Sequence, residues 1–95
     1  MIIRVSESVY AAIDEATDYS LEHFGLVASE KLGDRLYDGL EQTAWNYGKR
    51  VTGLPDSYRY LSVKPYNLFY RREEQAGEVV VYLLRHQSRQ TFATR

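Results

Sequence analysis

The sequence contains no cysteine and only two histidines, and these absences exclude several kinds of site. Without cysteine there is neither a disulfide nor a thiolate ligand to stabilise the fold, so a reducing, cytoplasmic setting is the natural expectation. Because His23 and His86 are the only imidazoles, a transition-metal site would need carboxylates, and these show no recognisable spacing. We therefore expect neither a metal nor a cofactor.

Long apolar runs are also missing from the sequence. The N-terminus, "MIIRVSESVY", lacks the apolar stretch of a signal peptide, and no run approaches the roughly 18 apolar residues that span a bilayer. A chain of 95 residues, 44% of them hydrophobic, can bury somewhat more than half of its unfolded surface, with little to spare. The sequence therefore predicts one soluble domain over residues 1–95.

The net charge of −1 conceals a division of charge along the chain. Residues 1–48 carry nine acids and three bases, whereas residues 49–95 carry nine bases and four acids. A patch of one sign attracts a partner of the opposite sign, although acidic residues also collect on helix surfaces without any partner. Charge alone leaves both interpretations open.

Two stripes of residues at helical spacing predict a helical hairpin in the acidic half. The first stripe follows a helix start at Ser6 and consists of Val9, Ile13, Ala16, Ser20 and Phe24. The second stripe ends around Gly48 and consists of Ser29, Leu32, Leu36, Leu40, Thr43 and Tyr47. Gly25 lies between them and is suited to the left-handed conformation that ends a helix.

Four short segments read as β-strands. The first is "IIRVS" at the N-terminus, and the others follow a loop that contains Gly53, Pro55 and Asp56: "YRYLSV" (58–63), "YNLFYRR" (66–72) and "EVVVYLL" (78–84). The last segment is apolar on both faces, which is typical of an inner strand. The order predicts an α+β domain, βααβββ, whose antiparallel sheet is covered by the helical hairpin.

In the order and spacing of these segments the sequence resembles the RelE/ParE superfamily, the toxins of bacterial type II toxin–antitoxin modules. The resemblance covers nearly the whole chain, and its most specific part is "YRYLSVKPYNLFYRREEQAGEVVVYLLRHQSR" (58–89). It implies a compact βααβββ fold and a labile antitoxin as partner. It also implies one of two activities: inhibition of DNA gyrase, in the ParE branch, or cleavage of mRNA on the ribosome, in the RelE branch.

The residues at the expected nuclease positions favour the ParE branch. RNA cleavage without a metal needs converging cations and a group that transfers protons. The position at which RelE-like toxins usually carry an arginine is Asn67, and Phe92 stands near the C-terminus where they carry Tyr or His. His86 is the only remaining candidate for a catalytic base, and the arginines that could hold a phosphate are Arg59, Arg71, Arg85 and Arg89.

The end of the last predicted strand, "LLRHQSR", is similar to the "HxxR"-type ending of ParE-like toxins. We therefore predict a non-catalytic contact surface for a large target, made of Arg59, Arg71, Arg85, His86 and Arg89. The alternative is that Arg85, Arg89 and Arg95 only keep the terminus solvated. The sequence thus predicts a toxin that binds DNA gyrase, with an mRNA-cleaving toxin or a degenerate, non-toxic binding module as alternatives.

Nine tyrosines are an unusual number for a chain of this length. Tyrosine combines an apolar ring with a hydrogen-bonding hydroxyl and is enriched where proteins meet. We expect some of them to pack on the sheet, namely Tyr58, Tyr60, Tyr66 and Tyr70. Those expected to contact an antitoxin lie on the helices and are Tyr10, Tyr19 and Tyr37.

Overall fold

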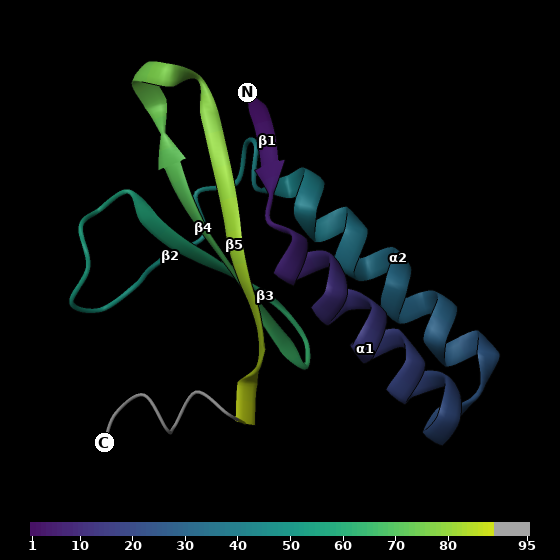
Figure 1. Ribbon diagram of the computed structural model, residues 1–95. Coiled ribbons are helices and arrows are strands. Elements are labelled where there is room, and N and C mark those ends of the chain that lie inside the picture. The colour runs from purple at the N-terminus through teal and green to yellow at the C-terminus, as the bar shows by residue number, and fades with distance from the viewer. Residues whose placement is uncertain (89–95) are drawn as a thin grey trace.

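The computed structural model describes residues 1–88 as two layers, a helical hairpin and a sheet (Figure 1). In chain order the elements are β1 (Ile2–Val5), α1 (Glu7–Phe24), α2 (Leu26–Gln42), β2 (Lys49–Arg50), β3 (Tyr58–Val63), β4 (Tyr66–Glu73), the 3-10 helix η1 (Glu74–Ala76) and β5 (Glu78–His86). The predicted α+β class and the helical hairpin are confirmed. Neither helix in this described part combines the length and apolarity needed to cross a membrane.

The sheet has five strands in the order β1-β5-β4-β3-β2. Strand β5 lies between β1 and β4, which confirms the inner strand predicted from its two apolar faces. The sheet differs from the predicted antiparallel one in two details: β1 pairs parallel to β5, and β2 adds two residues to the opposite edge. A parallel pair needs a long connection, and here it is the whole chain between the two strands. Strand β2 was not predicted because two residues are too few to show an alternation of apolar and polar side chains.

The helices cover one face of the sheet, and the core lies between the two layers. From the sheet the core receives Leu61, Leu68, Tyr70, Val79, Val81 and Leu84, and from the helices Val9, Ile13, Ala16, Leu32, Leu36 and Leu40. The helical residues are those of the two predicted stripes, with Ser20, Ser29 and Thr43 also buried. Burial of these apolar side chains is the main contribution that holds the hairpin on the sheet.

Two members of the predicted stripes are not in the core. Phe24 is 70% exposed, because it lies at the end of α1 where the hairpin extends past the sheet (Figure 1). Tyr47 is 56% exposed, because α2 ends at Gln42 and the helical repeat no longer applies beyond it. The predicted end of this helix, near Gly48, was therefore too late.

Gly48 lies where the chain passes from the end of α2 into β2, with a positive φ of 60°. A Cβ there would collide with the backbone carbonyl of Tyr60 and the hydroxyl of Tyr70. We expect Gly48→Ala to lower the free energy of unfolding by more than about 2 kcal/mol, since the left-handed conformation alone costs an L-residue about 1 kcal/mol and the carbonyl belongs to a paired strand. Urea denaturation measures the change.

Gly53 provides the matched control, because its φ is +86° but nothing lies within 4 Å of the position that a Cβ would take. Gly53→Ala should therefore lose only the conformational part, about 1 kcal/mol. Equal losses at the two positions would show that the close approach of Tyr60 and Tyr70 to Gly48 does not matter.

Tyr70 makes the stability of the fold depend on pH in the alkaline range. Burial beneath the helices raises the pKa of Tyr70 to about 12, although Arg72 and Arg59 oppose the shift. The folded state thus holds the phenolic proton more tightly than the unfolded chain, whose pKa is about 10. Stability from this group is complete below about pH 10 and should fall by up to about 2 kcal/mol towards pH 12.

Urea unfolding across this pH range tests the prediction, with Tyr70→Phe as the comparison. The variant should lose most of the alkaline decline. A smaller decline remains in it because burial also raises the pKa of Tyr82. Identical pH profiles for the two proteins would contradict a role for Tyr70.

Candidate functional site

A groove opens between the helical hairpin and the sheet, near the end of β5. It consists of two adjoining cavities of about 630 and 510 Å³ that share Ala16, Tyr19, Tyr66 and His86. We call it the hairpin groove. The residues that line it from the helices include several small ones, Ala12, Ala16, Ser20 and Ala28, and the sheet side contributes Tyr66, Leu84 and His86.

The groove follows from the side chains on the buried stripe of α1. Val9 and Ile13 are large and fill the space over the sheet, whereas Ala16 and Ser20 come next on the same stripe and are small. A helix that buries shorter side chains leaves a gap unless its axis moves closer to the sheet. Here the axis moves away instead, since the hairpin tip projects beyond the strands (Figure 1). The space that remains is the groove.

The lining of the groove combines apolar surface with positive charge. The cations that line it are Lys31, Arg35 and Arg85, and the one acid among its described lining residues is Glu15. Arg35 is held in place because its Nη2 donates to the carbonyl of Lys64 at 3.1 Å. Such a lining suits a segment that has apolar side chains flanked by carboxylates.

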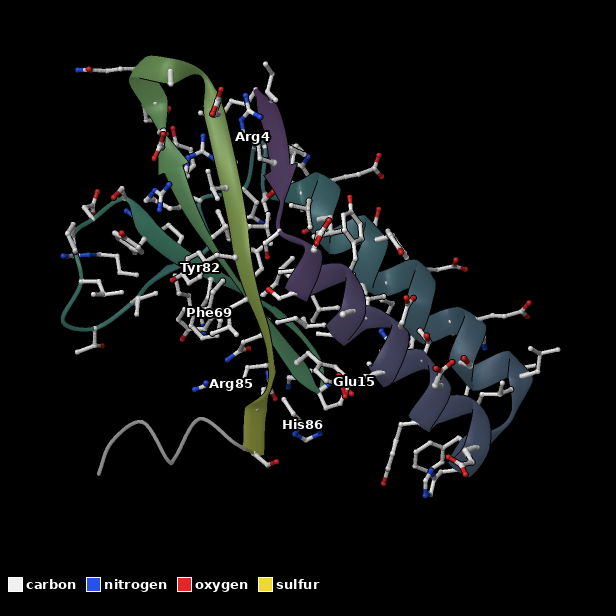
Figure 2. All side chains as sticks on the ribbon, viewed as in Figure 1. Arg4, Glu15, Phe69, Tyr82, Arg85 and His86 are labelled. Atoms are coloured by element: carbon white, nitrogen blue, oxygen red, sulfur yellow. The ribbon has the colours of Figure 1, made fainter. Side chains whose placement is uncertain are left out.

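His86 ends β5 and faces the helices. Its ring meets Tyr66 edge to face at 5.2 Å between centroids. The backbone N–H of Ser88 donates to His86 Nδ1 at 3.2 Å, and the Ser88 hydroxyl lies 2.8 Å from the same nitrogen. Because Nδ1 accepts, the ring proton is on Nε2 in this arrangement. Figure 2 shows His86 and Arg85 pointing in opposite directions from the strand.

The predicted target-binding residues do not form one cluster. Arg59 is opposite Tyr70 on the helix-covered face and bonds to Asp56 at 2.8 Å. Arg71 and Arg85 share the open face, but Arg71 pairs with Val80 in the register and Arg85 with Asn67, at the other end of β4. Only Arg85 and His86 are neighbours, and Arg89 lies outside the described residues.

Arg71 is also committed to partners within the chain. Its Nε donates to Glu73 at 2.7 Å, a bond that raises the pKa of the Arg71 guanidinium, and its guanidinium carbon lies 5.9 Å from the ring of Tyr58. Asn67, at the position where a nuclease would carry an arginine, accepts a bond from Gln87 at 3.0 Å. The described cations therefore do not converge on one phosphate-sized point.

The open face of the sheet carries a cluster of aromatic rings. Neighbouring centroids lie between 5.5 and 6.5 Å apart in the set Tyr58, Tyr60, Phe69 and Tyr82. Figure 2 shows Phe69 and Tyr82 on the side of the sheet away from the helices. The packing predicted for Tyr58 and Tyr60 is thus on this open face, while Tyr70 is in the core.

The three tyrosines predicted to contact an antitoxin lie in two places. Tyr10 and Tyr37 face each other across the hairpin at 6.5 Å between centroids, and they are 43% and 47% exposed. Tyr19 is 56% exposed, stacks on His23 at 3.9 Å and lines the hairpin groove. The structure therefore brings only Tyr19 to the groove.

Two features of the surface had no counterpart in the sequence prediction. One is the groove, for which the falling side-chain size along the first stripe was the available signal. The other is Trp45, which is 67% exposed in the turn after α2. Within residues 1–88 no three histidine, aspartate or glutamate side chains come together as metal ligands do.

Comparisons with known proteins agree with the observed fold and with the resemblance to the RelE/ParE superfamily. Residues 3–91 match the family described as "ParE toxin of type II toxin-antitoxin system, parDE". A solved structure, the chromosomal ParDE TA system from P. aeruginosa, matches with a TM-score of 0.76 over 90% of this chain and 95% of that one, at 14% sequence identity. At this identity the structural likeness concerns the fold. No curated protein sequence matches the chain.

Because the family match covers nearly all of the described chain, it defines the class of protein to which the chain belongs. The fold is that of a toxin from a type II toxin–antitoxin system. More narrowly, the chain belongs to the ParE toxin family, as the residues of the last three strands predicted.

Proposed function

We propose that this ParE-family toxin inhibits DNA gyrase by binding it and is neutralised by an antitoxin that occupies the hairpin groove. The observation that carries the proposal is the family match over residues 3–91, combined with a preformed groove on the helices. Inhibition by binding agrees with the separation of the described cations. The mRNA-cleaving toxin and the degenerate module are kept as outcomes of the tests.

The antitoxin segment that fits the groove has apolar side chains with acidic residues on either side. The apolar ones lie against Ala16, Ala28 and Leu32, and the carboxylates lie near Lys31 and Arg35. A segment that is disordered when free suits such an extended contact, because it folds against the groove on binding. Tyr19 and Phe24 are exposed in the free toxin and become covered.

Neutralisation follows from the position of the groove. Arg85 and His86 line its end and are also the adjacent pair of the predicted target-binding residues. An antitoxin segment in the groove therefore covers His86 and the strand end from which Arg85 extends. The target and the antitoxin compete for this end of the sheet, so the toxin is free to act only after the antitoxin has been degraded.

Filling the groove tests the antitoxin site. Ala28 is half-buried and lines the groove on α2, and we expect Ala28→Arg to block the antitoxin by placing a long charged side chain there. Affinity for the antitoxin encoded beside the toxin should fall by about a hundredfold, in line with the loss of a buried contact of about 3 kcal/mol. Co-expression should no longer restore growth.

Ala11→Arg is the matched control, since Ala11 is exposed on α1 and does not line the groove. This variant should bind the antitoxin as the wild type does. Normal antitoxin binding by Ala28→Arg, with the fold intact by circular dichroism, would place the antitoxin elsewhere.

The target is tested with purified toxin in two assays. Inhibition of gyrase supercoiling should be present in the wild type and should weaken by about tenfold in Arg85→Ala and in His86→Ala, a loss of about 1.4 kcal/mol for each contact. Ribosome-bound mRNA should stay uncut. Cleavage of the mRNA that stops in His86→Ala would instead assign proton transfer to His86. Inactivity in both assays, without a growth defect, would favour the degenerate module.

A further inference from the structure

The only tryptophan of the chain, Trp45, is exposed in the turn that follows α2. We call residues 43–48 the Trp45 turn. Two-thirds of the side chain faces solvent, so it contributes little to the core. The nearby Tyr47 is 56% exposed, and the first residue, Met1, is 46% exposed. Large aromatic side chains that are exposed together on a small protein often mark a binding surface.

The backbone of the Trp45 turn is fixed from both sides. The N–H of Trp45 donates to the carbonyl of Gln42, the last residue of α2, at 3.1 Å, and within the turn Asn46 Oδ1 accepts from the N–H of Gly48 at 2.8 Å. From the sheet, the Tyr70 hydroxyl donates to the carbonyl of Asn46 at 2.5 Å. The donor Tyr70 is fully buried, which fixes the position of the turn relative to the core.

Arg72 of β4 holds the same turn from a second position. Its Nη1 donates to the carbonyl of Thr43 at 2.9 Å, and Thr43 is itself completely buried. The guanidinium carbon lies 4.2 Å from the centre of the Tyr47 ring, and Nη2 lies 3.3 Å from the sulfur of Met1. The buried Arg72 thus joins the exposed Met1 and Tyr47 to the Trp45 turn.

A rigid turn that presents an indole to solvent has the properties of a binding anchor. Tryptophan is the residue type most enriched among the side chains that dominate protein interfaces. Fixing its backbone beforehand lowers the ordering cost of association. We infer that the Trp45 turn is a second contact with the protein target of the toxin, in which the indole enters an apolar pocket of the target.

The identity of that target rests on the proposed function, but the position of the anchor does not. The Trp45 turn lies at the end of α2, whereas the hairpin groove lies towards the opposite, projecting end of the same helices (Figure 1). An antitoxin segment in the groove therefore leaves Trp45 uncovered. We expect the target to contact both ends of the toxin, whereas the antitoxin contacts only one end.

The charges beside the turn favour a protein over a nucleic acid as the occupant. Nucleic-acid strands are tracked by several free cations in addition to aromatic rings. Here Arg72 is bonded to Glu74 at 2.7 Å, and Arg50 pairs with Asp56 at 3.1 Å. The other cation directly after the turn, Lys49, makes no ion pair with another described residue. An apolar pocket with a weakly acidic rim fits this surface.

Truncation of the indole is the first test. Trp45→Ala should weaken gyrase inhibition by about thirtyfold, the effect of losing one dominant anchor side chain, and should relieve growth inhibition. Its midpoint of urea unfolding and its affinity for the antitoxin should stay as in the wild type. The matched control is Val27→Ala, because Val27 is 65% exposed at the hairpin tip and does not line the groove.

Fluorine NMR observes the anchor in the unmutated chain. Toxin labelled with 5-fluorotryptophan gives a single resonance, since Trp45 is the only tryptophan. Adding gyrase should shift or broaden this resonance, and adding the antitoxin should leave it in place. This measurement needs no substitution, so it is informative even if Trp45→Ala affects folding.

Several outcomes would overturn the inference: full toxicity of Trp45→Ala, a shift of the resonance by antitoxin alone, or the same shift with single-stranded or duplex DNA alone. Toxicity that depends on Trp45 in a toxin that does not inhibit gyrase would instead support the anchor and contradict gyrase as the target. The two proposals are thereby tested separately.

Discussion

At one end of the molecule a buried cation, Arg72, fixes the position of the helical layer relative to the sheet. Its guanidinium is almost inaccessible, and it bonds Thr43 at the end of α2, Glu74 in η1 and the sulfur of Met1. A buried charge is tolerated only when it is paired and its donors are satisfied, so these partners have to keep their positions. The helical hairpin is consequently fixed to the sheet at one end. At its other end small side chains leave it separated from the strands, and the groove is the result.

This difference between the two ends gives the toxin two unlike surfaces. The fixed end presents a rigid turn with a single exposed indole, whereas the separated end presents an apolar groove with cations around it. Rigid convex anchors suit pockets on a folded protein, and grooves suit segments that fold on binding. The division of charge along the chain also has a structural basis: the nine acids of the first half all lie on the hairpin, and the described bases of the second half lie on the sheet and its loops.

The sequence was sufficient to predict the order of elements, the inner position of β5 and the core stripes, because each depends on local periodicity that burial then selects. It did not predict that β1 is parallel to β5, since pairing across the whole chain leaves no local pattern. Arg59 and Arg71 look equivalent in the sequence, but strand alternation sends them to opposite faces of the sheet. Trp45 was missed because exposure of a large ring depends on where the turn is held by Tyr70 and Arg72, which are far away in the sequence.

The position of β1 has a consequence for folding during synthesis on the ribosome. Among the described strands β1 pairs only with β5, and the ion pair at their junction joins Arg4 and Glu78, which are 74 positions apart. Strand β1 therefore leaves the ribosome long before its partner has been synthesised, and contacts of such long range form late in folding. A chain that stops before β5 lacks Val79 and Val81 in its core and keeps β1 unpaired. We therefore expect a chain shortened in this way to remain unfolded.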